Sequence, residues 1–426
     1  MKSIFQFSFL AVLLASFLMS GCEQDRCTRT EEYIGYEPVF KRIDDMRVPA
    51  SFGAARGLES PGKIFYYKGY LLINEMNKGI HVIDNSNPQS PVNIGFIDLP
   101  GTLDMAVNND ILYADNYLDL VGIDISNPTA PVEVSRVNDV FQSFYTYNDQ
   151  LGYLVEYVPT PTKLTIDCND INWGRGIWFN EDLMMVKNGE FFGVAINATT
   201  AISSNVVAGG SMARFTATNN YLYTIDGAEI KIFDVKQALP VLKNQLDVQW
   251  GVETLFPMAK NLFIGSNSGL LIYDISNPES PEFRSTFSHA TACDPVAVSG
   301  NTAYVTLRDG NACQGFVNQL DVIDVSNLNN PSLIKSYPMD NPHGLSIVDN
   351  TLYLCEGKFG LKTFDIADNK KIDTHLLDRV SGFFGWDVIV LPPGDLVMVV
   401  GSDGLYQFDA KDRSNLKEIS KISIEK

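Results

Sequence analysis

The chain has 426 residues, 45% of them hydrophobic, and a formal net charge of −19 at pH 7. That length exceeds most single domains, so the sequence predicts either several domains or a repeat architecture that grows by adding units. Because 51 acidic residues outnumber 32 basic ones, electrostatic repulsion argues against nucleic acid and anionic membrane surfaces as partners.

The first 21 residues are typical of an export signal. Lys2 supplies positive charge, the stretch from Ile4 to Met19 is mostly apolar, and small residues precede Cys22. This start resembles the lipobox of bacterial lipoproteins, which implies lipid attachment at Cys22 and contact with a membrane through that lipid only. The alternatives are an ordinary cleaved signal or a transmembrane anchor, although the apolar run is short for a membrane span.

An acidic stretch at residues 23–25 directly follows Cys22. It resembles the export signal of surface lipoproteins of the Bacteroidota. The resemblance implies a cell-envelope protein that is lipid-anchored to the outer membrane, on the periplasmic side or the surface. Residues 22–57 are interpreted as a lipidated tether and lead-in segment, and Pro38-Val39 within it is similar to the strand that follows each later turn. The lead-in therefore either stays extended or adds an outer strand to the folded body.

A strand that ends in aspartate and enters a Ser-Asn-Pro turn recurs along the chain. The clearest copy is Leu270–Pro281, and close copies are Ile80–Pro91, Leu120–Pro131 and Leu320–Pro331. Most of the anchor aspartates are 40 to 50 residues apart; they are Asp84, Asp124, Asp167, Asp234, Asp274, Asp324, Asp365 and Asp409. Each unit holds four short apolar segments separated by Asn, Asp, Gly and Pro, a pattern that predicts antiparallel strand meanders.

Four strands in each unit of this length predict an all-β fold, a β-propeller of four-stranded antiparallel blades, over residues 58–426. A single blade cannot bury both of its faces, so the blades must stack around an axis and the ring must close. Eight anchors predict eight blades. The 67-residue interval from Asp167 to Asp234 contains an irregular stretch, residues 168–210, which is interpreted as an insertion. If that unit forms no blade, the count is seven.

The recurring aspartates have a local structural explanation. A carboxylate at the end of a strand can accept backbone N–H groups of the following turn, and Pro fixes the turn's φ angle. Because the aspartates occupy equivalent positions, one in each blade, we expect them to be far apart. They are therefore interpreted as turn residues and not as a metal or catalytic set.

The repeated Ile-Asp-Ile-Ser-Asn-Pro turn, together with Pro342-His343-Gly344 and the strand Ala303–Arg308, resembles the LVIVD-repeat β-propeller lipoproteins. The resemblance covers about residues 60–410. It implies a periplasmic or surface propeller. Most members of that family have no assigned activity, so the resemblance implies no particular substrate.

The first strand of each propeller blade lines the central channel, so the beginnings of these strands meet at one face, the channel mouth. Aligning the units places four polar or aromatic residues in equivalent positions there: Glu253, Asp294, His343 and Trp386. Leu103 and Ala213 take the same position in earlier units. The four residues are a candidate binding cluster, and the alternative is that they only solvate the channel. No serine, cysteine or metal-ligand spacing accompanies His343, so we expect no catalytic set, metal or cofactor. His81 is interpreted as a structural strand residue.

Two cysteines fall at the same end of one unit. Cys293 begins the first strand and Cys313 lies in an enlarged loop between the second and third strands, so an exported protein could join them by a disulfide over the channel mouth. Cys355 ends an apolar strand and is expected to be a buried free thiol.

The leading interpretation is a non-enzymatic envelope lipoprotein that binds a protein, peptide or glycan through one propeller face. The alternative is a carbohydrate-active or lyase-type enzyme, with Glu253 and Asp294 as acid and base beside His343, if the carboxylates lie roughly 5–10 Å apart. A third interpretation is an architectural module of a larger envelope complex.

Overall fold

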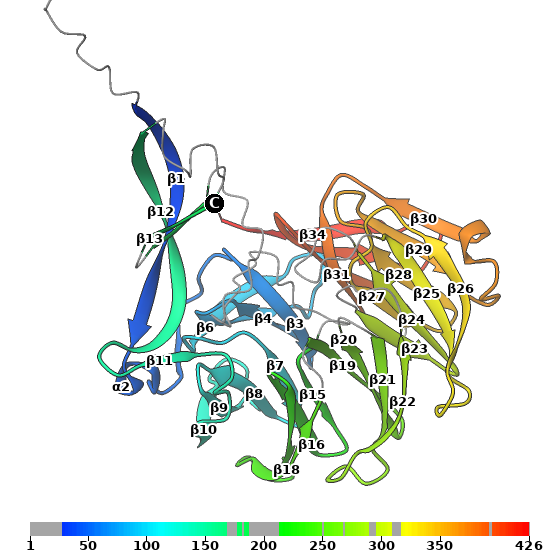
Figure 1. Ribbon diagram of the computed structural model, residues 1–426. Helices are drawn as coiled ribbons and strands as arrows, with labels where there is room; N and C mark the ends of the chain where they lie inside the picture. The colour runs from blue at the N-terminus through cyan, green and yellow to red at the C-terminus, as the bar shows by residue number, and fades with distance from the viewer. Residues whose placement is uncertain are drawn as a thin grey trace, which may run out of the picture. The chain divides into compact units, whose positions relative to one another are not determined.

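The computed structural model describes residues 28–167, 177–180, 183–186, 213–248, 251–266, 269–288, 295–308, 317–391 and 394–425. Within these ranges the chain is almost entirely β (Figure 1), and its strands form eight sheets. The helical elements in these described ranges are single turns, α2 (Ile43–Met46) and η2 (Ile372–Thr374). The chain divides into two compact units, residues 1–39 with 157–192 and residues 40–156 with 193–426.

Seven of the eight described sheets contain a meander of four consecutive strands, and all seven belong to the larger unit. Blade 1 holds β3 (Pro61–Tyr67), β4 (Tyr70–Glu75), β5 (Gly79–Asp84) and β6 (Val92–Asp98). Blade 2 holds β7 (Met105–Asn108), β8 (Ile111–Asn116), β9 (Asp119–Asp124) and β10 (Val132–Val137). Blade 3 holds β15 (Phe215–Thr218), β16 (Tyr221–Asp226), β17 (Glu229–Asp234) and β18 (Val241–Asp247).

The remaining meanders follow the same order. Blade 4 holds β19 (Val252–Met258), β20 (Asn261–Ser266), β21 (Gly269–Asp274) and β22 (Glu282–Ser288). Blade 5 holds β23 (Val296–Ser299), β24 (Thr302–Leu307), β25 (Gln319–Asp324) and β26 (Ser332–Pro338). Blade 6 holds β27 (Leu345–Val348), β28 (Thr351–Cys355), β29 (Leu361–Asp365) and β30 (Leu376–Val380). Blade 7 holds β31 (Gly385–Leu391), β32 (Leu396–Gly401), β33 (Gly404–Asp409) and β34 (Lys417–Ser423).

The first strands of successive blades contact one another in the order β3, β7, β15, β19, β23, β27 and β31. Blade 7 then packs on blade 1 through a shared apolar cluster that includes Ile73 and Met398. The side chains of Asn85 and Gln407 exchange hydrogen bonds of 2.9 and 2.8 Å across the same junction. The predicted all-β propeller of four-stranded antiparallel blades is therefore confirmed, and the ring closes within the larger unit.

The sequence repeat that contains the anchor Asp167 differs from the other repeats. Its strands β11 (Thr146–Asn148), β12 (Gly152–Asp167), β13 (Ile177–Asn180) and β14 (Leu183–Val186) join β1 (Thr28–Lys41) in the sheet order β11-β12-β1-β14-β13. β12 spans 16 residues and β1 spans 14, about twice the length of a blade strand. These long strands pair with each other, and β7 of blade 2 contacts β15 of blade 3 directly. The preferred count of eight blades thus gives way to the alternative of seven, with an eighth sheet of different topology.

The lead-in segment does add an outer strand. β2 (Ser51–Gly53) pairs antiparallel with β6 at the edge of blade 1. Just before it, Arg47 reaches blade 2 and forms ion pairs of 3.0 Å with Asp119 and 2.7 Å with Asp139. The outer strand comes from Ser51–Gly53, whereas Pro38-Val39 lies in β1.

The core of the larger unit lies between neighbouring blades. The middle strands read as continuous apolar runs, such as Leu71-Leu72-Ile73 in β4, and these side chains are fully buried. A blade buries both faces of its middle strands because a sheet packs on each side, so the strands do not alternate between apolar and polar residues. Each such Leu or Ile contributes about 1.5–3 kcal/mol by leaving water. Cys355 ends β28, one of these middle strands, and is a buried free thiol, as predicted.

The anchor aspartates perform the predicted local role in each of the seven described meanders. Each carboxylate accepts the backbone N–H of the residue two positions later, at 2.7–3.0 Å; the acceptors are Asp84, Asp124, Asp234, Asp274, Asp324, Asp365 and Asp409. In blade 4 the Arg284 side chain also bonds Asp274, and this bond and those from Ser276 lower the pKa of Asp274 to about 2. We call this end of the blades, where the third strand stops, the turn end.

Candidate functional site at the channel mouth

The beginnings of the first strands meet at the opposite end of the blades, the mouth end. Neighbouring blades are hydrogen-bonded there: Leu255 N donates to Ala213 O at 2.7 Å, and Gly344 N donates to Trp386 O at 2.9 Å. The Thr306 hydroxyl of blade 5 donates to His343 O at 2.8 Å. The structure therefore places Ala213, His343 and Trp386 at the junctions where successive blades meet.

His343 is buried at the junction of blades 5, 6 and 7, with an exposed fraction of 4%. Its Nε2 lies 2.9 Å from Asn341 Oδ1, and the Arg308 guanidinium donates to its Nδ1. The imidazole therefore donates through Nε2 and accepts through Nδ1. This is the Nε2–H tautomer of the neutral ring. Burial, and next the charge of Arg308, lower the pKa of His343 to about 2. At neutral pH this imidazole is uncharged and its remaining N–H is held by Asn341, so the ring serves to orient its neighbours.

Two aromatic rings of blade 7 lie against this imidazole. The ring centroids of Phe384 and Trp386 are 4.1 Å apart, and those of Phe384 and His343 are 5.5 Å apart. The Trp386 ring meets His343 at 5.1 Å in an edge-to-face arrangement. Both residues are half-buried, and Trp386 also packs against the apolar cluster between blades 7 and 1. This geometry gives blade 7 a rigid aromatic surface at the mouth.

Charged groups of blades 3, 4 and 5 complete the arrangement. Glu253 is half-buried, and burial raises its pKa to about 7 while the charges of Arg308 and Arg214 act in the opposite direction. The Arg214 guanidinium lies 4.3 Å over the ring of Phe144. We refer to these side chains as the mouth cluster, comprising Arg214, Glu253, Arg308, His343, Phe384 and Trp386.

At the mouth end, blades 1 and 2 contribute buried charged groups that already have ion-pair or hydrogen-bond partners within the protein. Lys63 Nζ lies 2.8 Å from Asp104 and donates to Phe215 O at 2.9 Å. Asp115 accepts bonds from the backbone of Leu103 at 2.7 Å and of Asp104 at 2.9 Å. Burial raises the pKa of Asp115 to about 6. Leu103, which aligns with the predicted site residues, is half-buried.

Several predicted residues lie outside the described ranges. These are Cys22, Cys293, Asp294 and Cys313. The lipidation site, the disulfide and the second carboxylate of the enzyme hypothesis thus stay predictions.

Sequence reasoning missed a set of buried acid–base pairs that recurs at the mouth end. An acid at the end of a second strand bonds a base in the third strand; the pairs are Glu75 with His81 at 3.0 Å, Asp226 with Lys231 at 2.6 Å and Glu356 with Lys362 at 2.8 Å. Each acid also accepts a backbone N–H from a segment that precedes the first strand of its blade. The donors are Ser60 for Glu75, Ser143 for Asp226 and Asn341 for Glu356. The signal is an acid followed five or six residues later by a base. His81 is thus a structural residue, as predicted.

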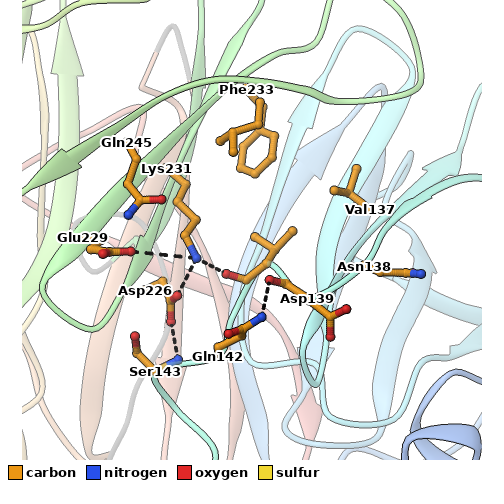
Figure 2. Close-up of a pocket in the computed structure, with 12 residues that line it drawn as sticks. Val137, Asn138, Asp139, Gln142, Ser143, Asp226, Glu229, Lys231, Phe233 and Gln245 are labelled. Carbon is orange, nitrogen blue, oxygen red and sulfur yellow. Dashed lines mark hydrogen bonds and ion pairs between the residues drawn. The ribbon is translucent and has the colours of Figure 1, made fainter.

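A cavity of about 440 Å³ lies between blades 2 and 3 (Figure 2). Lys231, the cation that lines it, bonds Asp226 and Val140 O and lies 4.0 Å from Glu229. Because this ammonium group already has two hydrogen-bond acceptors and a second carboxylate nearby, the cavity offers no uncommitted positive charge, and the mouth cluster is the stronger candidate.

Neither a metal site nor a membrane-spanning helix is found in the part of the chain that the structure describes. No group of three or more His, Cys, Asp or Glu side chains is placed to hold a metal ion in the described ranges. None of the described helices is long and apolar enough to cross a membrane.

Comparison with family models finds the LVIVD repeat in four regions, residues 63–98, 102–139, 260–288 and 291–338. The chain is an LVIVD-repeat propeller. The four regions fall in blades 1, 2, 4 and 5, whose turns keep the Ser-Asn pair after the anchor aspartate, as in Ser276-Asn277. Blades 3, 6 and 7 of this LVIVD-repeat propeller have the same strand order with diverged turns, such as the one after Asp365.

Solved structures with the same fold are similar to the chain over most of its length. The periplasmic gluconolactonase PpgL of Pseudomonas aeruginosa shares 10% identity at a TM-score of 0.51, covering 92% of this chain and 97% of its own. The computationally designed Ika8 protein shares 11% identity at a TM-score of 0.51, covering 87% and 91%. At such identity the likeness shows the fold alone. A search of curated proteins finds no match.

Proposed function

We propose that this LVIVD-repeat propeller is a cell-envelope binding module that holds a protein, peptide or glycan through the mouth cluster and does not catalyse a reaction. The observation that supports the proposal most directly is the arrangement around His343. Its two ring nitrogens face Arg308 and Asn341, and its ring edges contact Phe384 and Trp386. Such a set presents fixed aromatic and polar surfaces, which is what a binding site requires.

The same arrangement argues against acid–base catalysis by the imidazole. A general base needs a free lone pair and a pKa near the working pH. The pKa of His343 is lowered to about 2 and both ring nitrogens have partners. Among the described residues of the mouth cluster, this leaves Glu253 as the one group with a suitable pKa.

The proposed location in the envelope rests on the amino-terminal sequence. We propose that lipid on Cys22 anchors the protein to the outer membrane and that the disulfide Cys293–Cys313 holds a loop over the mouth. Protease treatment of intact cells will digest the propeller if it faces outward and spare it if it faces the periplasm.

The enzyme hypothesis keeps one specific observation in its favour. Burial raises the pKa of Glu253 to about 7, a value that suits a carboxylic acid acting as a proton donor near neutral pH. A structure with the same fold is a gluconolactonase. On this alternative the propeller would act on a carbohydrate ester or glycoside, with Glu253 as the acid.

Capture from envelope extracts tests the binding proposal. The full chain and its Trp386→Ala variant are used as bait after circular dichroism shows that both are folded. Arg379→Gln is the control, because Arg379 is exposed and lies in β30 of blade 6. The proposal expects a protein or glycan that wild type and the control retain and Trp386→Ala loses. Equal retention by all three baits would contradict it, and turnover of lactones or glycosides that Glu253→Gln abolishes would support the enzyme alternative.

A further inference from the structure

Arg214 differs from Arg308, the other arginine of the mouth cluster, in its partners. In the described ranges its side chain makes no ion pair or hydrogen bond, and its guanidinium is stacked on Phe144 at 4.3 Å. Its backbone N–H donates to Asp104 Oδ2 at 2.6 Å, which fixes the start of β15. A guanidinium that lies over an aromatic ring without hydrogen-bonding to it can still use its N–H groups, and those donors match a carboxylate in a bidentate fashion. Arg214 is therefore a preformed place for an anionic group.

The aromatic pair offers the complementary surface. Phe384 and Trp386 are half-buried and held by contact with each other and with His343. A rigid ring surface of this kind binds flat, weakly polar faces with little loss of side-chain entropy. The C–H face of a sugar ring has that character, while its hydroxyl groups can bond the amide of Asn341 or the carboxyl of Glu253 at the same end of the ring.

The two features lie on different sides of the mouth. Arg214 comes from blade 3 and Trp386 from blade 7, which are three blades apart in the seven-bladed ring of the described residues. A single sugar could occupy one of them. A ligand that uses both must extend across the mouth, so it has several sugar rings.

We infer that the ligand of the mouth cluster is an acidic oligosaccharide whose carboxylate is bound by Arg214 and whose sugar ring packs on Phe384 and Trp386. This inference rests on the proposed binding function and names its ligand class. Although the chain carries a charge of −19 and the charge of Arg214 acts on Asp115 and Glu253, burial raises the pKa of both carboxyls. His343 is neutral, and burial raises the pKa of Glu253 to about 7, which reduces repulsion of the ligand's carboxylate.

An acidic peptide is less well suited to this surface. Peptides that bind by adding a strand to a sheet need unpaired main-chain groups at a strand edge. At the mouth end the backbone groups are already used: His343 N donates to Cys355 O at 2.8 Å and Gly344 N donates to Trp386 O. Recognition must therefore come from side chains, and these are a guanidinium, aromatic rings, an amide and a carboxyl.

The test compares a uronic-acid trisaccharide with its methyl ester, which has the same rings and length but no charge. Binding to the full chain is measured by calorimetry. We expect the ester to bind about tenfold more weakly, and Arg214→Gln to lower affinity for the acid about tenfold while changing affinity for the ester less than twofold. Trp386→Ala should weaken both, and the control Arg379→Gln neither.

Each other outcome overturns the inference in a distinguishable way. Equal affinity for acid and ester would contradict the acidic class and leave a glycan-binding function in place. Binding of poly-glutamate that depends on Arg214, without binding of the trisaccharide, would assign the site to acidic peptides. If no sugar or peptide binds, and Trp386→Ala also retains every envelope partner, both the inference and the proposed function fail.

Discussion

The two ends of each blade are built from the same four strands but follow different rules. At the turn end, every described blade repeats one device, an aspartate that accepts a turn N–H, as Asp84 and Asp274 do. At the mouth end, equivalent positions hold a different residue in each blade, among them Glu253, His343 and Trp386. The repeated turn aspartates determine the blade architecture. The residues that differ between blades at the mouth end can form a binding site.

Two carboxyl groups, one at each end, have pKa values shifted in opposite directions. At the turn end, hydrogen bonds to Arg284 and Ser276 stabilise the charged form of Asp274 and lower its pKa to about 2. At the mouth end, burial disfavours the charged form of Glu253 and raises its pKa to about 7. Ionisation of Asp274 therefore stabilises the fold, whereas ionisation of Glu253 destabilises it. Three substitutions and one matched control compare the two ends.

The largest effect is expected from Lys362→Met, which removes the partner of a buried acid at the mouth end. Lys362 lies 2.8 Å from Glu356, whose side chain has no exposed surface. An unpaired buried carboxylate should lower the free energy of unfolding by about 3–5 kcal/mol, measured by urea denaturation.

The matched control for that change is Lys411→Met at the turn end. The Lys411 side chain is 74% exposed and lies 3.9 Å from Asp409. An exposed pair of this kind contributes about 0.5 kcal/mol or less. A similar loss of stability in both variants would show that the contrast between the two ends is wrong.

The second prediction concerns pH and Glu253→Gln. The pKa of Glu253 is raised from 4.5 to about 7 on folding, so the protonated form stabilises the native state at low pH and this contribution is lost as pH rises through 7. Wild-type stability should fall between pH 5 and 8 with a slope of at most about 1.4 kcal/mol per pH unit from this group. Glu253→Gln should have a smaller slope in urea titrations over that range. An unchanged slope would contradict the assignment.

The smallest effect is expected from Asp274→Ala at the turn end. Losing the bonds to Ser276 and Arg284 should cost about 1 kcal/mol, similar to the loss of a helix cap. Because the pKa of Asp274 is lowered from 3.8 to about 2, the contribution is present above pH 4 and disappears as pH falls to 2. Thermal unfolding of the two proteins at pH 7 and pH 2 should therefore differ at the higher pH and converge at the lower.

How much could be predicted from sequence varies with the range of the interactions. The strand pattern, the blade order and the turn role of Asp274 are local, and each follows from a dozen consecutive residues. The pairing of β1 with β12 joins segments more than 100 residues apart. No local pattern marks it, so the unit that ends at Asp167 was counted as a blade. The sequence did not identify Arg214 and Arg308 as site residues for a related reason. Neither occupies the position, equivalent between repeats, that identified Glu253 and His343.

The sequence by itself determined the repeat, its strands and the turns that separate them, because backbone geometry and the burial of alternating or continuous apolar residues depend on neighbours in the chain. Only the tertiary structure decided that seven meanders close the described ring and that His343 is a neutral residue held between Arg308 and Asn341. Both depend on which blades touch. Ring closure and the pKa of a buried group are set by residues that are distant in sequence and adjacent in space.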